Sequence, residues 1–313
     1  MSLQGKRILL TGGSGFLGSH LCEKLLQLDN QLTLLCLPDD PLANLQAIQN
    51  QLQVVRCDLT DTGQLEKIVK GVAPQYVYHL AARIDRTRSA RLLGEMVANN
   101  LLPIVSLIQA LAGFELERFL VLGTSDIYGQ TPAPCREDAS PNPNSPYALT
   151  KSLALTFARY AWQNYNLPAV MLVPFMVYGP RQNPRMMISQ ALNAVAQGED
   201  FPMTRGEQVR EFNYVGDIVA GLITAATAEG VLGETINLCG GPKLTIYEAS
   251  QRIFSMLGAR GKLLRDSLPY RAQETMSHFG DPEKCRRLLN YQPQTSFEDG
   301  IKKTYSYFQD LEK

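Results

Sequence analysis

Short apolar runs alternate with longer amphipathic stretches through the first half of the chain. The runs predict six strands: Arg7–Thr11, Gln31–Leu35, Leu52–Arg56, Tyr76–Leu80, Arg118–Gly123 and Ala169–Val173. The stretches between them predict helices, notably Gly15–Leu28, Gly63–Lys70, Arg88–Ala112 and Tyr147–Tyr165. Because strands and helices that alternate in this way build a parallel sheet covered on both faces, we expect an α/β fold.

The pattern changes at two places. Five prolines between Gly129 and Pro146 exclude regular helix and central strand, so a long loop is expected there. After Phe175 the alternation loosens. We therefore predict a first lobe over residues 1–174, to which residues 209–238 return. Residues 175–208 and 239–313 form a smaller substrate-binding lobe. Pro103 lies inside a predicted helix, where it is expected to cause a kink.

Composition limits the partners and the cellular location. Thirty basic residues balance thirty acidic ones, so we expect neither nucleic acid nor an anionic membrane as a partner. Six cysteines without a C-x-x-C pair or nearby histidines predict free thiols and no metal site. Because the first residues lack the apolar stretch of a secretory signal and no apolar run of about 20 residues is uninterrupted, we expect neither a signal peptide nor a membrane span. We expect a cytoplasmic protein.

A glycine-rich segment follows the first predicted strand. In Thr11-Gly12-Gly13-Ser14-Gly15-Phe16-Leu17-Gly18, the glycines Gly12, Gly15 and Gly18 stand where the strand turns into a helix. A dinucleotide pyrophosphate can approach the backbone there and lie on the helix N-terminus. A plain turn has a similar composition, but the strand before and the amphipathic helix after favour a cofactor site in a Rossmann-type doubly wound sheet.

The choice between NAD and NADP depends on the end of the second strand, where an acid usually accepts the ribose hydroxyls of NAD. Cys36 occupies that position, and Asp39 and Asp40 follow in a proline-flanked turn. The sequence favours NAD and leaves NADP open. After the third strand, Asp58 is expected to contact the adenine or to cap the next helix.

A tyrosine and a lysine stand four residues apart on a predicted helix. Tyr147 and Lys151 therefore share one face, and we expect the lysine charge to lower the pKa of the phenol from about 10. After the fifth strand, Thr124 can hydrogen-bond a substrate hydroxyl, with Ser125 beside it. Asp126 is either a proton-abstracting base or a turn-closing residue.

Six motifs in order resemble the nucleotide-sugar epimerase/dehydratase family of extended short-chain dehydrogenases/reductases. They are the glycine segment, His79-Leu80-Ala81-Ala82, Thr124-Ser125, Tyr147-x-x-x-Lys151, Val177-Tyr178-Gly179-Pro180-Arg181 and Val209-Arg210-Glu211-Phe212-Asn213-Tyr214-Val215-x-Asp217. They extend over roughly residues 7 to 250. Two positions depart from the family pattern. Met176 replaces an asparagine near the substrate phosphates, and Asp126 stands where related dehydratases have a glutamate, one methylene longer.

The resemblance implies an enzyme that oxidises a nucleoside-diphosphate sugar at C4 through bound NAD. Tyr147 would be the base, Lys151 would hold the ribose, Thr124 would assist and Asp126 would serve an elimination. The substrate would contact Ser125, Arg181 and Arg210, although Arg181 also reads as a loop charge. The implied cofactor residues are Gly12, Gly15, Phe16, Leu17, Gly18, Asp58, Leu59, Leu80, Ala81, Ala82, Tyr147 and Lys151. Asn100 and His79 are expected to be structural.

Several functions share this set of residues. An epimerase needs only the tyrosine, lysine and threonine, whereas a dehydratase also needs a base such as Asp126. A 4-keto-6-deoxy sugar reductase would use the same set with NADPH. A binding protein that senses NAD(P) is the alternative of another class. The resemblance also implies a homodimer that pairs the helices predicted at Arg88–Ala112 and Tyr147–Tyr165.

Overall fold

A seven-stranded parallel sheet forms the centre of the computed structural model, which describes residues 3–311. Its order is β11-β6-β5-β4-β1-β2-β3. The strands are β1 (Arg7–Thr11), β2 (Gln31–Cys36), β3 (Gln53–Arg56), β4 (Tyr76–His79), β5 (Arg118–Leu122), β6 (Ala169–Pro174) and β11 (Thr235–Leu238). The strand order reverses between β1 and β4, and open sheets bind ligands at such a point. The predicted Rossmann-type sheet is confirmed.

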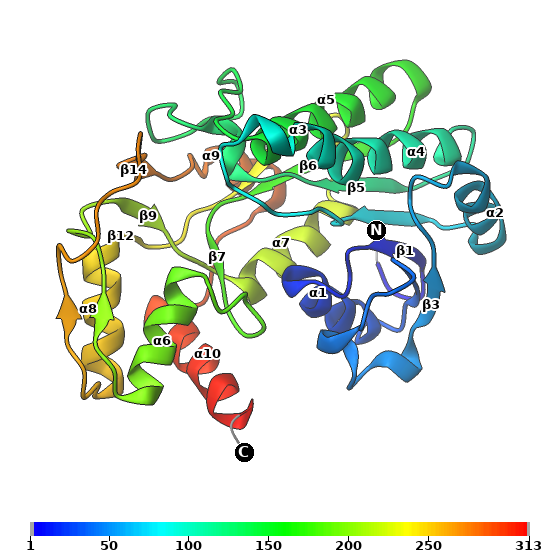
Figure 1. Ribbon diagram of the computed structural model, residues 1–313. Helices are drawn as coiled ribbons and strands as arrows, with labels where there is room; N and C mark the ends of the chain where they lie inside the picture. Colours follow the sequence, from blue (N-terminus) through cyan, green and yellow to red (C-terminus); the bar gives the residue numbers. More distant parts are fainter. Residues whose placement is uncertain (1–2, 312–313) are drawn as a thin grey trace.

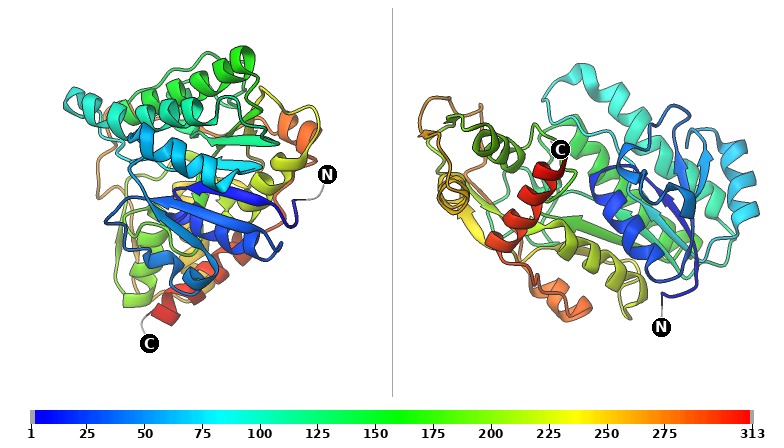
Figure 2. Two further views of the ribbon diagram at one scale, coloured as in Figure 1. Left: turned by 90° about the vertical axis from the view of Figure 1, so that its right-hand side faces the viewer. Right: turned by 90° about the horizontal axis from the view of Figure 1, so that it is seen from below.

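Helices cover both faces of this sheet (Figures 1 and 2). One layer contains α2 (Thr62–Val72), α3 (Leu93–Met96), α4 (Leu102–Leu111) and α5 (Pro146–Tyr165). The other contains α1 (Phe16–Leu26) and α7 (Val215–Thr227), and α9 (Glu283–Leu289) packs against α7 and β11. Short 3₁₀ turns are η1 (Ala43–Leu45), η2 (Gln49–Gln51), η3 (Ala90–Leu92) and η5 (Ser125–Tyr128). The apolar strands, buried between two helical layers, form the first core.

The helix predicted at Arg88–Ala112 is interrupted. A π-helical turn, η4 (Val97–Leu101), separates α3 from α4, and Pro103 follows it near the start of α4. Because proline lacks an N–H group, the regular ladder cannot continue through this position. By length and composition alone, Ala90–Leu111 could cross a membrane. In the structure its helices α3 and α4 pack against α5, and α4 also packs against α2.

The second lobe is built from short strands and three helices. Strands β7 (Val177–Tyr178) and β10 (Asn213–Tyr214) form one pair, and β8 (Phe201–Pro202) and β13 (Leu263–Leu264) another. A three-stranded sheet has the order β12 (Lys243–Thr245), β9 (Val209–Glu211), β14 (Ser277–His278). Helices α6 (Met187–Gln197), α8 (Ile246–Leu257) and α10 (Phe297–Leu311) complete this lobe around a second core (Figure 1).

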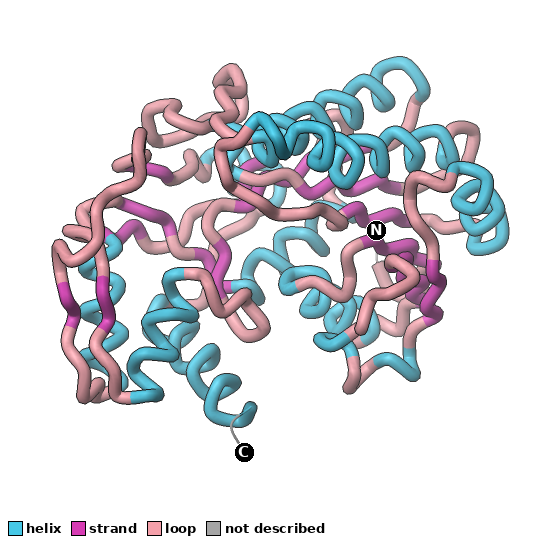
Figure 3. Tube along the Cα trace, in the orientation of Figure 1, coloured by secondary structure: helices cyan, strands magenta, loops and turns pink. Residues whose placement is uncertain are grey.

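The lobe boundaries differ in detail from the predicted ranges. The chain returns to the large sheet through α7 and β11, whereas β9, at residues 209–211, pairs with β12 and β14. Helix α9, inside the range 239–313, contributes Cys285 and Leu289 to the first core. The segment predicted as a loop between Gly129 and Pro146 lacks regular helix and strand (Figure 3). We keep the two-lobe division as a proposal with these boundaries.

Candidate active site

The glycine segment packs tightly against the end of β4. Gly12 has a φ of +74°, and a Cβ atom there would lie 2.5 Å from the backbone nitrogen of Ala81. A Cβ on Gly18 would overlap the carbonyl oxygen of Gly12. Thr11 Oγ1 bonds His79 Nδ1 at 2.8 Å and accepts from the Ala81 N–H at 3.3 Å. The turn therefore requires glycine at two positions, and His79 is a buried structural residue as expected.

The N-terminus of α1 suits a pyrophosphate. Gly15 is its N-cap, no side chain caps the helix, and no acid stands in the first turn. A Cβ on Gly15 would meet only the carbonyl oxygen of Gly12, at 3.3 Å, and the residue is exposed. The helix therefore offers backbone N–H groups and a positive dipole end to an anion that approaches closely. The Phe16 ring lies edge-on to His20.

An acid contacts this segment from the loop after β2. Ser14 Oγ donates to Asp40 Oδ2 at 2.5 Å, and the Leu42 N–H donates to Asp40 Oδ1 at 2.9 Å. Arg56, at the end of β3, donates to the carbonyl oxygens of Leu37, Pro38 and Asp40. The guanidinium thus fixes the loop that carries Asp40, and Cys36 is buried at the end of the strand.

Three of the predicted cofactor residues, Asp58, Leu59 and Leu17, contact other parts of the protein. Asp58 accepts from the N–H and hydroxyl of Thr60 at 2.8 and 2.7 Å, which holds its pKa below the usual range. The alternative that Asp58 caps helix α2 is wrong, because Asp61 is the N-cap. Leu59 is buried in the first core, and Leu17 packs against it. Leu80, Ala81 and Ala82 follow β4 at the sheet edge beside Gly12.

Thr124, Tyr147 and Lys151 lie together at the same edge of the sheet. Thr124 is the N-cap of η5, and its hydroxyl bonds the phenol of Tyr147. Burial raises the pKa of Tyr147 to about 12, and the Asp126 charge acts in the same direction. Burial also lowers the pKa of Lys151 to about 8. The expected fall in the phenol pKa is therefore wrong in direction, because burial and the Asp126 charge outweigh the lowering effects of the Arg86 charge and the Thr124 hydrogen bond.

Two ion pairs lie in this region, and the first of them acts on the tyrosine. Arg86 Nε lies 2.6 Å from Asp126 Oδ2, and both charges influence the Tyr147 phenol. Arg210 Nη2 lies 2.7 Å from Glu274 Oε1, while its Nη1 donates to the Val209 carbonyl at 2.9 Å. Asp126 therefore already has a cationic partner, and Arg210 is directed by an acid from a distant part of the chain.

These groups line a cavity of about 560 Å³. Its charged and imidazole side chains are Arg86, Arg88, Asp126, Arg210, Arg271, Glu274 and His278. Four arginines face two carboxylates, an excess of positive charge that suits a diphosphate. Arg86, Arg88, Arg271 and His278 were not predicted from the sequence. They come from two loops and a two-residue strand, which carry no periodic pattern.

Comparison with known proteins agrees with this geometry. The sequence profile described as the NAD dependent epimerase/dehydratase family matches residues 8–239. The chain belongs to the NAD-dependent epimerase/dehydratase family. An uncharacterized UDP-glucose epimerase of Bacillus subtilis (strain 168) is 30% identical over 97% of this chain and 98% of its own length.

Two solved members of the family have the same fold. The UDP-glucuronic acid 4-epimerase of Bacillus cereus, in complex with UDP-glucuronic acid and NAD, is 30% identical with a TM-score of 0.83, over 97% of this chain and 99% of its own. The UDP-glucose 4-epimerase of Thermotoga maritima, with UDP-glucose, is 25% identical with a TM-score of 0.90, over 98% and 99%. The protein is thus an NAD-dependent enzyme of the epimerase/dehydratase family, as the resemblance implied.

Two residues of the family motifs lie away from the cavity. Asn100 is buried, accepts from the Arg83 N–H at 2.7 Å and donates to Thr150 Oγ1 at 3.2 Å. It therefore ties the loop after β4 to helix α5, a structural contact as expected. Arg181 forms an ion pair with Glu23 of α1, and His20 of the same helix contacts the Pro180 carbonyl oxygen. The predicted contact of Arg181 with substrate stays a prediction.

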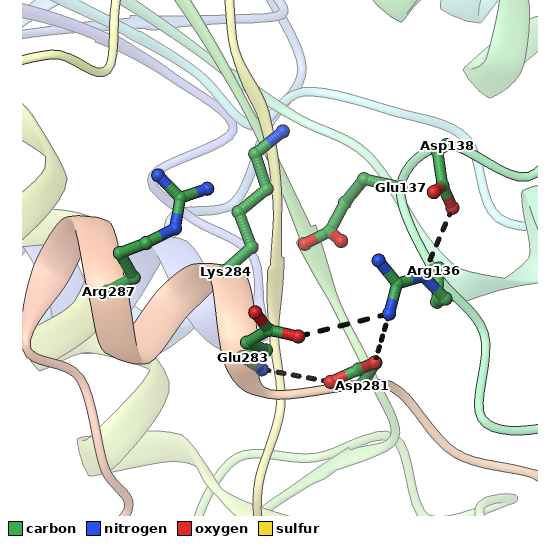
Figure 4. Close-up of a pocket in the computed structure, with 7 residues that line it drawn as sticks. All are labelled: Arg136, Glu137, Asp138, Asp281, Glu283, Lys284 and Arg287. Carbon is green, nitrogen blue, oxygen red and sulfur yellow. Dashed lines mark hydrogen bonds and ion pairs between the residues drawn. The ribbon is translucent and has the colours of Figure 1, made fainter.

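A second pocket, of about 190 Å³, lies where the loop before α5 meets α9 (Figure 4). Arg136 forms ion pairs there with Asp138 and Asp281, at 3.3 and 3.0 Å. Glu137 accepts from the Asn237 N–H of β11 at 2.8 Å. The Cys135 N–H donates to the Phe279 carbonyl at 2.9 Å. In this epimerase/dehydratase family member, these contacts fix the loop that leads into Tyr147.

Proposed function

We propose that the protein is a 4-epimerase that acts on a nucleoside-diphosphate hexose by transient oxidation at C4. The observation that carries this proposal is the position of Tyr147. Its phenol bonds the Thr124 hydroxyl and lies next to the arginine-lined cavity, on the helix that also carries Lys151. The glycine segment that fits a dinucleotide follows β1, near the centre of the same sheet.

Each side chain has a distinct task. Tyr147, as a phenolate, takes the proton of the C4 hydroxyl, and Thr124 hydrogen-bonds that oxygen while the proton moves. Lys151 supplies a buried positive charge and would bind the nicotinamide ribose. Bound NAD would accept the hydride from C4 and return it to the opposite face of the same carbon, and the positive charge of its oxidised ring would favour a phenolate nearby. Tyr147 returns the proton to the C4 oxygen after the 4-keto sugar has presented its other face.

The substrate diphosphate would bind Arg210. The Arg210 side chain is only 15% exposed, and its guanidinium pairs with Glu274, which also lines the cavity. Arg271 lines the same cavity and adds a second cation. Planar guanidinium groups bind phosphate oxygens with two parallel hydrogen bonds, which makes arginine well suited to a diphosphate. The relatives with UDP-glucose and UDP-glucuronic acid support a uridine nucleotide.

Asp126 favours epimerisation over dehydration. A dehydratase needs a carboxylate that is free to accept the C5 proton. Asp126 is instead held 2.6 Å from Arg86 Nε, so the carboxylate would have to leave this charged partner before it could reach a C5 proton. The remaining threonine, tyrosine and lysine are sufficient for epimerisation.

Asp40 would select NAD over NADP. It is held against Ser14 of the glycine segment and stands four residues beyond the usual acid position, now Cys36. A carboxylate at the adenosine ribose accepts hydroxyl hydrogen bonds and repels a 2′-phosphate. Arg56, the nearest arginine of this region, is engaged by three backbone carbonyls.

A homodimer is part of the proposal. Exposed apolar side chains of α5 and the neighbouring helices lie at Leu93, Leu102, Leu149, Phe157 and Tyr160. Leu149, Phe157 and Tyr160 share one face of α5 by their helical spacing. Exposed apolar groups arranged in this way are typical of a protein interface. We also place the enzyme in the cytoplasm, where its six buried free cysteines would stay reduced.

The deciding experiment is an NMR assay of product stereochemistry with UDP-, dTDP- and GDP-hexoses and tightly bound NAD. We expect interconversion at C4 without net consumption of the cofactor. Formation of a 4-keto-6-deoxy product would instead identify a dehydratase, and stoichiometric use of NADPH would identify a reductase. Tyr147→Phe should lower the rate by about 10²- to 10⁴-fold, the usual contribution of a general acid–base, while NAD stays bound.

A further inference from the structure

One buried nitrogen in the substrate cavity has no hydrogen-bond partner. Among the described residues, buried side-chain polar atoms without a partner are Tyr78 Oη, Arg118 Nε, Arg181 Nη1, His278 Nε2 and Tyr291 Oη. Of these residues, His278 lines the cavity of about 560 Å³. Because an unsatisfied buried polar group costs free energy, such an atom next to a cavity indicates a partner that arrives with the ligand.

The imidazole is held in place by aromatic packing. Its ring lies 5.4 Å from that of Phe175, centroid to centroid, and Phe175 stacks on Tyr128 at 5.9 Å. Tyr128 is fixed in turn, since its hydroxyl donates to Asn237 at 2.7 Å. Gly280 allows this close packing, because a Cβ there would lie 2.8 Å from the Phe175 ring. The unpartnered nitrogen therefore has a defined position before any ligand binds.

His278 lies between the two ends of the proposed substrate. It pairs with Arg210 in the register of the neighbouring strands β14 and β9 (Figure 1), and both residues line the cavity. The charges of Asp126 and Arg86, which also reach Tyr147, act on the imidazole as well. If the reacting carbon lies at Tyr147 and the diphosphate at Arg210, the sugar ring passes His278. This inference rests on the proposed function.

The imidazole is neutral, which limits the groups it can recognise. Burial lowers the pKa of His278 to about 4, and Arg210 and Arg86 act in the same direction against the raising effect of Asp126. A neutral imidazole has one donor and one acceptor nitrogen. A sugar hydroxyl can donate to or accept from Nε2 in either tautomer, whereas a carboxylate or phosphate can only accept. A hydroxyl is therefore the matching partner.

We propose that His278 is a specificity residue that hydrogen-bonds, through Nε2, a non-reacting hydroxyl of the substrate's sugar ring. The residue orients the sugar between Tyr147 and the diphosphate site. It takes no part in proton transfer to C4.

Two variants separate hydrogen bonding from packing. His278→Phe keeps an aromatic ring against Phe175 and removes both nitrogens. His278→Gln places an amide near the position of Nε2 and serves as the conservative rescue. Calorimetric titration with UDP and with the UDP-hexose that the wild type binds gives the affinity for each part of the ligand. A matched 2-deoxy or 3-deoxy sugar nucleotide identifies the hydroxyl.

We expect His278→Phe to weaken binding of the UDP-hexose roughly threefold to tenfold, the range for one neutral hydrogen bond, with UDP affinity unchanged. His278→Gln should recover most of the loss, and the deoxy nucleotide that lacks the contacted hydroxyl should bind wild type and His278→Phe equally. Unchanged UDP-hexose binding by His278→Phe, or an equal loss for UDP, overturns this proposal alone. A wild-type protein that binds no sugar nucleotide overturns the proposed function with it.

Discussion

Arg86 and Asp126, forty residues apart in sequence, meet as an ion pair 2.6 Å long beside the Tyr147 phenol. Arg86 thus engages the Asp126 carboxylate, which an elimination would need as its base. For a 4-epimerase, Asp126→Asn should therefore lower kcat by less than about tenfold, because Asp126 accepts no proton in the reaction. The measurement is the C4 interconversion rate by NMR.

The same assay in deuterated water provides the control for Asp126. A base at C5 would introduce deuterium at that carbon, whereas an epimerase acting only at C4 leaves C5 unlabelled. A fall of more than about a hundredfold in Asp126→Asn, the scale for loss of a general base, together with C5 labelling in the wild type, would contradict our assignment.

A substitution at Gly15 should test pyrophosphate binding without disturbing the fold. A Cβ atom there contacts only the Gly12 carbonyl, at 3.3 Å, so Gly15→Ala should fold. The methyl group would occupy the space where the phosphates approach, and NAD affinity should fall at least about tenfold, or ~1.4 kcal/mol. Gly71→Ala is the matched control, since nothing lies within 4 Å of its Cβ. Equal NAD affinities for both variants would argue against a cofactor at this turn.

Asp40 should govern the choice of dinucleotide. Asp40→Asn removes the negative charge beside Ser14, so NAD affinity should fall about tenfold to a hundredfold, as for one hydrogen bond to a charged group. NADP should gain relative to NAD, because the repulsion of its 2′-phosphate is removed. Fluorescence titration with both dinucleotides measures this ratio. Asp39→Asn, an exposed neighbour, should change neither affinity, and an equal effect of the two variants would refute the role of Asp40.

Buried histidines should make the fold sensitive to acid. Burial lowers the pKa of His79 to about 3, against 6.5 for an ordinary histidine. Between these values the unfolded chain binds the proton more tightly, so stability falls as the pH decreases from about 6.5, by about 1.4 kcal/mol per pH unit for this residue. Above pH 6.5 the residue contributes no pH dependence. Urea unfolding of His79→Gln should show a shallower slope between pH 5 and 6.5. An unchanged slope would exclude His79 as the cause.

The apolar face of α5 should hold the dimer together. Phe157→Glu places a charge on that face, where Phe157 is 39% exposed, and should give a monomer by analytical ultracentrifugation at micromolar concentration. Leu264→Glu is the control, since Leu264 is similarly exposed on β13 of the second lobe. A monomeric wild type, or equal dimerisation of wild type and Phe157→Glu, would reject the proposed interface.

Local patterns were enough to predict the central sheet. Each of the six predicted strands agrees with an observed strand to within one residue at either end, because a buried parallel strand is a short apolar run between polar turns. The Tyr147–Lys151 pair was also predictable, since helical spacing puts both on one face. The reading of Asp58 as a helix cap failed because Asp61, three residues on, competes for the same role.

Cavity residues that come from distant parts of the sequence could not be predicted. Arg86 lies in the loop after β4, and His278 belongs to a two-residue strand, so neither has a neighbouring pattern that marks it as a cavity residue. The Tyr147 pKa was predicted in the wrong direction because its sign depends on burial. Tertiary packing alone determines that burial, and here it outweighs the nearby positive charge.

The contacts that fix the loop before α5 impose an order on biosynthesis. Cys135 is held by Phe279 and Glu137 by Asn237, partners that the ribosome adds a hundred residues later or more. Domains tend to fold from the N-terminus as the chain emerges. A nascent chain that has completed β1 to β6 thus has its glycine turn, but the loop leading to Tyr147 still lacks its anchors. Competence for sugar chemistry therefore arises only near the end of translation.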